Sequence, residues 1–424
     1  MMRLLLCVAV VLLARGARDF VANTEAGVSL ALGLLLVVGY FVGEAFEKIR
    51  LPRLTGYILT GLAVGPYGIE LVGAELGTLK LVNGTAIAII AMTAGVELDL
   101  RSLRPLARSI IAIVTFAILA GAIAITGAAF ASRALFGFLG ELEAVPALAV
   151  CATLGVALAA QSPAVIVALR KETRATGELS DTVLGAVIVG DLIVIVLFAI
   201  VQTFARAALG GAGSVEGAAV HLLWHVIGSA AIGAIAGWML ASWLARSEDG
   251  ASILVLVACV VLAEVGQRLA LDPIVVAVVA GAYVRNRTPR VAHTLEGGLG
   301  ATAATMYVLF FAVAGASLHL DVLATLGIPA LMIVVARAIG IVTGARAGGA
   351  IAHASPAVRK WAGVGMLPQA GLAIALALVF GRAFPELADS AVALALGVVA
   401  LNELLAPAVW RAVLIRNRDP KTER

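Results

Sequence analysis

Long apolar runs separated by short polar breaks recur along almost the whole chain. Many of these runs are about 20 residues or longer, the length that an α-helix needs to cross the hydrocarbon core of a bilayer. The pattern predicts an all-α, polytopic membrane protein with about 13 transmembrane helices. We place the spans at 26–46, 52–70, 82–97, 107–132, 144–169, 181–206, 218–244, 251–269, 272–285, 300–318, 322–347, 358–382 and 387–413.

The composition supports this prediction. Of the 424 residues, 62% are hydrophobic and only 13% are charged, a balance far from that of a soluble domain. The 45 glycines suit helices that pack closely in a membrane, where small residues let two backbones approach each other. The lipid bilayer is therefore the expected environment of nearly the whole chain.

The distribution of Lys and Arg predicts the orientation of these helices. If the first span begins outside the cell, the inner loops and tail carry 21 Lys and Arg residues and the outer loops carry five. Basic residues are enriched in cytoplasmic loops. We therefore expect a multi-pass protein of the cell's inner (plasma) membrane with its N-terminus outside and its C-terminus in the cytoplasm. The net charge of +4 then reflects topology, and no nucleic-acid partner is expected.

The two ends of the chain differ from the membrane region, 26–413. Residues 1–25 contain a short apolar stretch after Arg3 and then small residues, typical of a secretory signal peptide, although an extra N-terminal segment is the alternative. Residues 414–424 form a short basic tail that is expected in the cytoplasm. The cysteines Cys7, Cys151 and Cys259 lie in apolar segments without ligand-like spacing, so we expect them to pack as small hydrophobic residues.

The thirteen spans divide into two equivalent halves. Repeat one covers 26–206, a linker helix covers 218–244, and repeat two covers 251–413. Because one linker helix separates the halves, the second is inverted relative to the first, which is the plan of many secondary transporters. The sequence therefore predicts two inverted repeats.

The fifth span of each repeat is interrupted at a matching place. The first contains Gln161, Ser162 and Pro163, and the second contains Pro368 and Gln369. Proline removes a backbone donor and leaves a carbonyl without its helical partner, and such groups in a membrane need a cavity, water or another helix. Discontinuous helices at equivalent positions point to a binding site near the membrane midplane. A kink made only for packing is the alternative.

Asp191 is the most informative polar residue, since it lies in the apolar run 187–197. An ionisable group at that depth is normally paired, turned to a cavity, or part of an ion or proton path. A carboxylate is both an oxygen ligand for small cations and a site that binds a proton. We predict that Asp191 binds Na⁺ or K⁺ and H⁺, and that Ser162, Gln161 and Gln369 belong to the same ion- and proton-binding site. A buried ion pair that only fixes helix packing is the alternative.

Two further charged residues share this depth. At 1.5 Å per residue, Arg337 lies about 14 Å and Glu403 about 10 Å from the inner ends of their spans, compared with about 15 Å for Asp191. Arg337 should bind a carboxylate or freed helix carbonyls, because a lone buried charge is costly. It can be a charge that rests on Asp191 when no cation is bound, or a static partner of Glu403. The sequence leaves both open.

Three stretches carry a resemblance to a known family: 51–66 (LPRLTGYILTGLAVGP), 93–100 (TAGVELDL) and 310–318 (FFAVAGASL). Together and in order, they resemble the monovalent cation/proton antiporter superfamily, in its second branch of bacterial sodium or potassium/proton exchangers. The resemblance implies a core domain that moves against a dimerisation domain, and a homodimer. It aligns Asp191 with the family's ion- and proton-carrying aspartate, and it places Gln161-Ser162-Pro163 and Pro368-Gln369 in crossed, unwound helices. Arg337 aligns with a core-domain lysine or arginine.

The sequence departs from this family at Gly190, where relatives carry Asp, Asn, Gln or Lys directly before the aspartate. One titratable carboxylate remains in the motif, which favours electroneutral exchange. We therefore expect a secondary-active antiporter that exchanges Na⁺ or K⁺ for H⁺ by alternating access, with no enzymatic activity and no cofactor. An organic-anion carrier of similar architecture is one alternative. A non-transporting sensor or gated channel is another.

Overall fold

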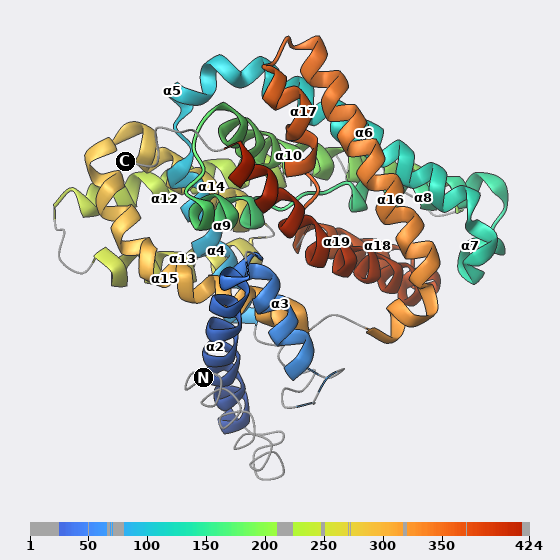
Figure 1. Ribbon diagram of the computed structural model, residues 1–424, viewed down its shortest axis with the longest axis horizontal. Coiled ribbons are helices and arrows are strands. Elements are labelled where there is room, and N and C mark those ends of the chain that lie inside the picture. Colours follow the sequence, from blue (N-terminus) through green and yellow to red (C-terminus); the bar gives the residue numbers. More distant parts are fainter. Residues whose placement is uncertain are drawn as a thin grey trace. The chain divides into compact units, whose positions relative to one another are not determined.

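The computed structural model describes residues 25–49, 51–65, 68, 70, 80–209, 224–246, 251–269, 271, 273–316, 320–369 and 371–417. Helices make up the regular structure of these ranges, as predicted (Figure 1). The chain divides into two compact units, the first of Met1–Asp99 with His225–Leu318 and the second of Leu100–Trp224 with His319–Arg424. Each unit thus takes its helices from both halves of the sequence. The two predicted repeats are not two separate bodies.

In its described residues, the first unit contains three helices from before the linker, the linker helix, and three from after it. They are α2 (Glu25–Lys48), α3 (Arg53–Val64), α4 (Lys80–Glu97), α12 (Ser229–Leu244), α13 (Ala251–Arg268), α14 (Pro273–Arg287) and α15 (Pro289–Ala316). A single π-helical turn, η4 (Trp224–Gly228), leads into α12.

The second unit contains a long helix, a broken helix and a long helix from each half. Those from the first half are α6 (Ala107–Ala131), α8 (Ala144–Leu158) with α9 (Pro163–Thr173), and α10 (Glu178–Ala208). Those from the second half are α16 (Leu320–Ile351), α17 (Pro356–Gly365) with α18 (Gly371–Ala383), and α19 (Ala388–Arg416). Short turns connect them: α5 (Leu100–Leu103), η2 (Arg104–Leu106), η3 (Arg133–Leu135), α7 (Gly137–Gly140) and η5 (Pro385–Leu387).

Several of the predicted spans are complete membrane crossings within the described residues. In the described ranges, five helices or broken helices are long and apolar enough to cross a bilayer, and six if the bent pair Pro289–Gly300 and Thr302–Ala316 is one span. The largest boundary error is in α15, which begins at Pro289 rather than at residue 300. Proline is favoured in the first turn of a helix. The buried residues Ala292, Leu295 and Leu299 follow helical spacing, although the stretch before residue 300 is not a continuous apolar run and was therefore not predicted as part of the span.

Helices from the two halves pack on each other in a reciprocal way. In the first unit, α3 packs on α15 and α4 on α14, while α2 also contacts α15 and α13 contacts α4. In the second unit, α6 packs on α16, α10 packs on α17 and α18, and α19 packs on α8 and α9. Each of these contacts has its equivalent when the two halves are exchanged, as two repeats related by a twofold axis require.

The face between α6 and α16 depends on three glycines spaced four residues apart. Gly340, Gly344 and Gly348 of α16 lie against the backbone oxygens of Ala120, Phe116 and Ala112 of α6, and the two helices run side by side (Figure 1). A Cβ atom on Gly340 would lie 2.6 Å from the Ala120 oxygen, and one on Gly344 would lie closer still to the Phe116 oxygen. Small residues at this spacing let membrane helices approach closely.

Replacing Gly344 by Ala should therefore destabilise the second unit. The added methyl group meets backbone rather than a movable side chain, so the helices must separate, at a cost of about 1–3 kcal/mol. The midpoint temperature of unfolding of the purified protein should fall. Gly127→Ala is the matched control, because Gly127 lies on α6 with nothing within 4 Å of its added Cβ. An unchanged midpoint for Gly344→Ala would contradict the close packing.

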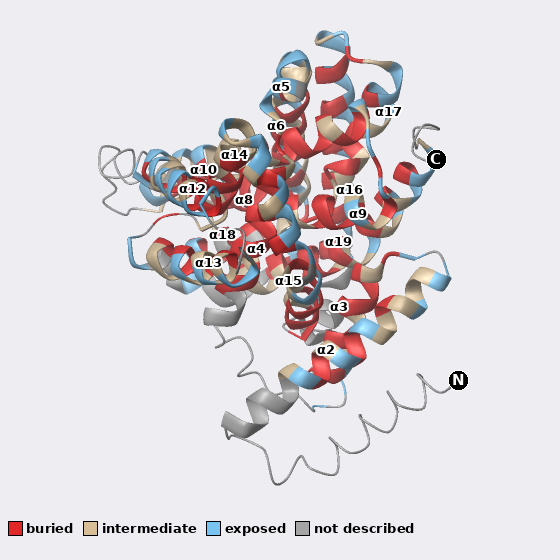
Figure 2. Cartoon of the chain, turned by 90° about the vertical axis from the view of Figure 1, so that its left-hand side faces the viewer, coloured by how far each residue is buried: buried red, intermediate tan, exposed pale blue. Residues whose placement is uncertain are grey.

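Buried residues form the faces along which the helices of each unit pack (Figure 2). Large apolar side chains nevertheless remain exposed, among them Ile123, Trp238 and Ile328. Such exposed apolar surface suits helices that contact lipid. The cysteines Cys151 and Cys259 are buried and free, in agreement with their expected role as core residues. Cys7 lies outside the described residues.

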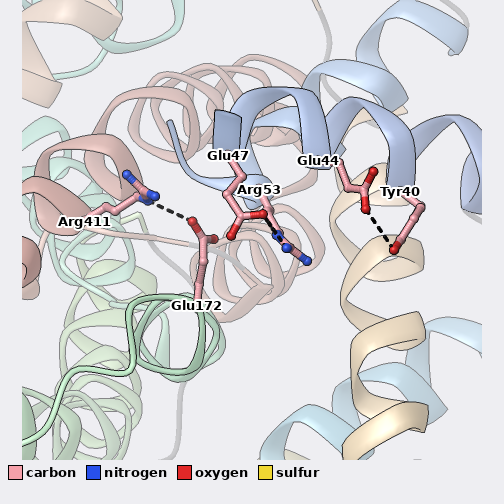
Figure 3. A network of polar contacts seen from close by, with 6 residues as sticks. All are labelled: Tyr40, Glu44, Glu47, Arg53, Glu172 and Arg411. Carbon is pink, nitrogen blue, oxygen red and sulfur yellow. Dashed lines mark hydrogen bonds and ion pairs between the residues drawn. The ribbon is translucent and has the colours of Figure 1, made fainter. Parts of the chain in front are cut away.

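Charged side chains pair at helix ends and between neighbouring helices. In the first unit, Arg53 pairs with Glu47, and the Tyr40 hydroxyl donates to Glu44 at 3.1 Å (Figure 3). Glu264 and Arg268 form a salt bridge at 2.7 Å. In the second unit, Arg411 of α19 donates to Glu172 of α9 at 2.8 Å (Figure 3), and Arg170 pairs with Asp181 at 2.7 Å. The buried charges described below are separate from these pairs.

Candidate functional site

The candidate site lies in the second unit, where two helices are broken. In the first, α8 ends at Leu158 and α9 begins at Pro163. Ser162 caps α9: its hydroxyl oxygen accepts a hydrogen bond from the Val165 amide at 3.3 Å, and Pro163 occupies the first helical position, where no donor is needed. The sequence thus forms a new helix start immediately after the break. Ser162 is 2% exposed, and Pro163 is also buried.

The second break also contains a proline. The helix α17 ends at Gly365, and α18 begins at Gly371. Pro368 lies in the segment between them and supplies no backbone donor, so the Val364 carbonyl loses its i+4 helical partner and accepts from the Leu367 amide at 3.2 Å instead. Both predicted interruptions are therefore present. Pro368 and Gln369 are buried, and the Gln369 side chain is fully so.

Arg337 joins the two breaks. It projects from α16, its side chain is 0% exposed, and its guanidinium donates to the backbone oxygens of Leu158 at 2.7 Å and Ala160 at 2.9 Å in the first break. It also donates to the Leu367 oxygen in the second break at 2.7 Å. Carbonyls at the C-terminal end of a helix carry partial negative charge, so a cation stabilises the ends of α8 and α17 together. The five donors of arginine suit this task.

Neither carboxylate that the sequence suggested is the partner of Arg337 in this conformation. Its hydrogen bonds within the described residues go to the three backbone oxygens and, at 3.4 Å, to the side-chain oxygen of Asn402. The suggested static pair with Glu403 is therefore wrong for this conformation, and no hydrogen bond joins the guanidinium to Asp191. The physical reason is that the breaks create unsatisfied oxygens that must be satisfied wherever they are buried. The alternative that named freed helix carbonyls is confirmed.

Asn402 and Gln369 complete this network. The Gln369 amide donates to the Leu158 oxygen at 3.0 Å and accepts from Asn402 at 3.0 Å. Asn402 also donates to the Val398 oxygen of its own helix, α19, at 3.0 Å. Asn402 was not among the predicted site residues, although a polar amide inside an apolar helix is a signal that identifies such a position. The network links both breaks to α16 and α19.

Asp191 lies in the interior of α10 and is 6% exposed. The preceding residue, Gly190, lies directly against the side chain of Gln161 from the first break. Gln161 is 2% exposed, and within the described residues neither its amide oxygen nor its amide nitrogen has a hydrogen-bond partner. The fold thus brings the turn that carries Asp191 next to the first broken helix, as predicted.

Glu403 is the other buried carboxyl group of this unit. It is 1% exposed, and its Oε2 atom has no hydrogen-bond partner among the residues that the structure describes. Pro407, four residues later, is inside α19 and cannot donate to the Glu403 carbonyl, so that carbonyl loses its helical partner although the helix continues. Glu403 is therefore a second candidate for proton binding, in addition to Asp191.

The first break and the helix beside it carry several oxygen groups. Within the described ranges, no group of three or more His, Cys, Asp and Glu side chains is arranged to hold a metal ion. The Leu158 and Ala160 carbonyls already accept from Arg337, and the Ser162 hydroxyl accepts from the Val165 amide. The amide oxygen of Gln161 has no such bond within the described residues.

The chain is similar in sequence and in structure to proteins described as sodium/proton antiporters. "Probable Na(+)/H(+) antiporter 3" of Methanocaldococcus jannaschii is 23% identical over 169 residues, which is 40% of this chain and 40% of that protein. The sodium proton antiporter MjNhaP1 of the same organism, solved at pH 8, matches with a TM-score of 0.70 and 18% identity over 92% of this chain and 99% of that one. A second structure of MjNhaP1, an electron-microscopy map, matches with a TM-score of 0.74 and 18% identity, covering 93% and 97% of the two chains.

At this identity, the structural matches establish the fold. The sequence itself matches the family described as "Sodium/hydrogen exchanger, transmembrane" over residues 29–416, nearly the whole described region. This match includes both broken helices and Asp191. The chain therefore belongs to the transmembrane sodium/hydrogen exchanger family, whose members are multi-pass membrane transporters rather than enzymes.

Proposed function

We propose that this protein is a secondary antiporter that exchanges Na⁺ or K⁺ for H⁺ by alternating access. It acts as a homodimer in the inner (plasma) membrane, with its N-terminus outside and its C-terminus in the cytoplasm. The family match and the names of the similar proteins support cation/proton exchange. The asymmetry of Lys and Arg residues supports the orientation.

The single observation that carries the proposal is the buried carboxylate of Asp191 in α10, beside a broken helix, in a unit where Arg337 is already bonded to the backbone. A buried carboxylate is stabilised when it binds either a proton or a cation. Because one carboxylate offers one site, the two cargoes compete for it. Competition at one site that faces each side of the membrane in turn couples the outward flux of one ion to the inward flux of the other.

The same observation weakens the organic-anion alternative. An anionic substrate needs a positive group at the site, such as a free guanidinium or the positive end of a helix. Arg337, the buried cation of this unit, gives its hydrogen bonds to the two helix breaks instead. The Arg337 guanidinium is thus bound to the helix breaks, and the charged group proposed to bind the transported ion is the Asp191 carboxylate.

Reconstituted vesicles test the proposal directly. Purified protein in proteoliposomes with an imposed proton gradient should dissipate that gradient when Na⁺ or K⁺ is added, as reported by a pH-sensitive dye trapped inside. Li⁺ and a panel of organic acids complete the set. Proton movement driven by the organic acids and not by the cations would establish the carrier alternative. Cation flux without any proton movement would indicate a channel.

The exchange should be one for one and electroneutral. One carboxylate holds one proton or one monovalent cation, Gly190 adds no second titratable group, and Arg337 cannot release a proton, because a guanidinium does not deprotonate in proteins. The rate should therefore not change when a membrane potential is imposed with valinomycin and K⁺ in Na⁺-driven assays. Net movement of one charge would respond with about 2.3 kcal/mol per 100 mV.

Glu403 provides the control for this prediction. Glu403→Gln keeps the size of the side chain but removes its proton, and the variant should exchange electroneutrally like the unchanged protein. A voltage-dependent current that tracks cation flux would contradict one-for-one exchange. If Glu403→Gln then abolished that current while exchange continued, Glu403 would be the carrier of the extra proton.

A further inference from the structure

A side chain at position 190 would displace the Gln161 side chain. A Cβ atom built on Gly190 would lie 2.7 Å from the amide oxygen of Gln161, 3.1 Å from Cγ2 of Val114 and 3.4 Å from Cδ1 of Ile118. The first of these distances is shorter than real Cβ contacts, so the end of the flexible Gln161 side chain would have to move, and the second requires a small shift of Val114. The space in front of Gly190 is therefore filled by the Gln161 side chain, which enters it from the first helix break.

Gln161 occupies this space without hydrogen bonds. Both polar atoms of its amide are buried, and neither has a partner among the residues that the structure describes. A buried polar group without a partner costs about 1–3 kcal/mol. Gln369, in the second break, is equally buried, but its amide nitrogen and oxygen are both bonded. The two glutamines of the breaks thus differ: Gln369 holds helices together, and Gln161 has an amide that is available to a ligand.

We propose that Gly190 and Gln161 are a matched pair. The absent side chain at position 190 makes room for the Gln161 amide, whose oxygen is a neutral ligand for the monovalent cation that Asp191 binds. This inference rests on the exchange proposed above and adds to it a specific ligand. A neutral amide coordinates the cation through its oxygen without adding a titratable group. Asp191 therefore remains the residue for which the cation and the proton compete.

Gln161→Ala should weaken apparent cation affinity and leave the fold intact. A hydrogen bond or ligand contact to a charged group contributes roughly 1.5–3 kcal/mol, so the cation concentration for half-maximal exchange should rise by about tenfold or more. The unfolding midpoint should stay the same or rise, because a buried amide without partners is removed. Gln369→Ala is the matched control, and it should lower the midpoint while changing affinity less. The reverse pattern would overturn the proposal.

A compensating pair of substitutions tests the packing independently of transport. Gly190→Asn alone should lower the unfolding midpoint, because its Cβ collides with Gln161. The double variant Gly190→Asn with Gln161→Ala should recover most of that loss, since the Asn amide can take the vacated space. It should also recover measurable exchange, because an amide oxygen is again present near Asp191. Sites in contact are expected to couple in this way, and independent sites to add.

The outcomes separate this inference from the proposed function. Additive losses of stability in the double variant would overturn the matched pair, whatever the transport result. If Gly190→Asn is not recovered as folded protein, Gly190→Ala with and without Gln161→Ala tests the same contact. If the unchanged protein shows no exchange but Gln161→Ala restores the stability lost in Gly190→Asn, the packing of Gly190 on Gln161 is correct. The proposed function and the role of Gln161 as a cation ligand are then both wrong. If the unchanged protein exchanges and Gln161→Ala has unaltered affinity, only the ligand role fails.

Discussion

Asp191→Asn is expected to abolish cation-dependent proton flux and to leave the protein folded. Asparagine keeps the size of the side chain and its capacity to hydrogen-bond, but it has no charge to attract a cation and binds no proton at neutral pH. Because both cargoes compete for this carboxylate, the variant should lose both at once. In proteoliposomes, its proton flux on addition of Na⁺ or K⁺ should equal that of protein-free vesicles.

The same substitution at Asp181 is the matched control. Asp181 lies in the first turn of the same helix, α10, and pairs with Arg170 at 2.7 Å. Asp181→Asn removes an ion pair that is partly exposed, which costs little stability. We expect exchange to continue in this variant. The unfolding midpoint of Asp191→Asn should be close to that of the unchanged protein or above it, since a buried charge is removed. Robust exchange by folded Asp191→Asn would exclude the residue from the mechanism.

Arg337→Met is expected to destabilise the second unit more than any other single substitution discussed above. Methionine fills a similar volume but donates no hydrogen bond, so the backbone oxygens of Ala160 and Leu367 lose the donor shown for them. Each buried oxygen without a partner costs about 1–3 kcal/mol, and the negative ends of α8 and α17 also lose their shared cation. The expected loss is about 3 kcal/mol or more.

Arg337→Lys should rescue only part of this loss, because one ammonium group has three donors at one point and cannot reach all the oxygens that the planar guanidinium reaches. The measurement is the unfolding midpoint and the monodispersity of the purified variants. Arg346→Met is the control, since Arg346 lies on the same helix, α16, and is exposed. Full stability of Arg337→Lys would mean that the positive charge alone, and not the several N–H donors of the guanidinium, stabilises the two broken helices. Full stability of Arg337→Met would contradict the role assigned to Arg337.

Local features of the sequence were sufficient to predict the class of fold and the broken helices. Apolar runs must form helices in a membrane, because a helix satisfies its own backbone hydrogen bonds. A proline breaks that pattern wherever it stands, so the interruptions at Pro163 and Pro368 could be predicted without knowledge of their neighbours. Asp191 was conspicuous for the same reason, since an ionisable residue in an apolar run is costly whatever surrounds it. These are properties of one helix in lipid.

The tertiary structure decided which groups meet. Depth arithmetic placed Arg337, Asp191 and Glu403 in one layer, but it does not give the direction of a side chain around its helix, and the guanidinium lies at the helix breaks rather than on a carboxylate. The contact of Gly190 with Gln161 likewise joins residues from different helices, and the sequence indicated only a missing side chain. The two compact units could not be read from the repeats either, because each unit combines helices from both halves. Partners in a buried network depend on the geometry of several helices at once, which the pattern along a single helix does not contain.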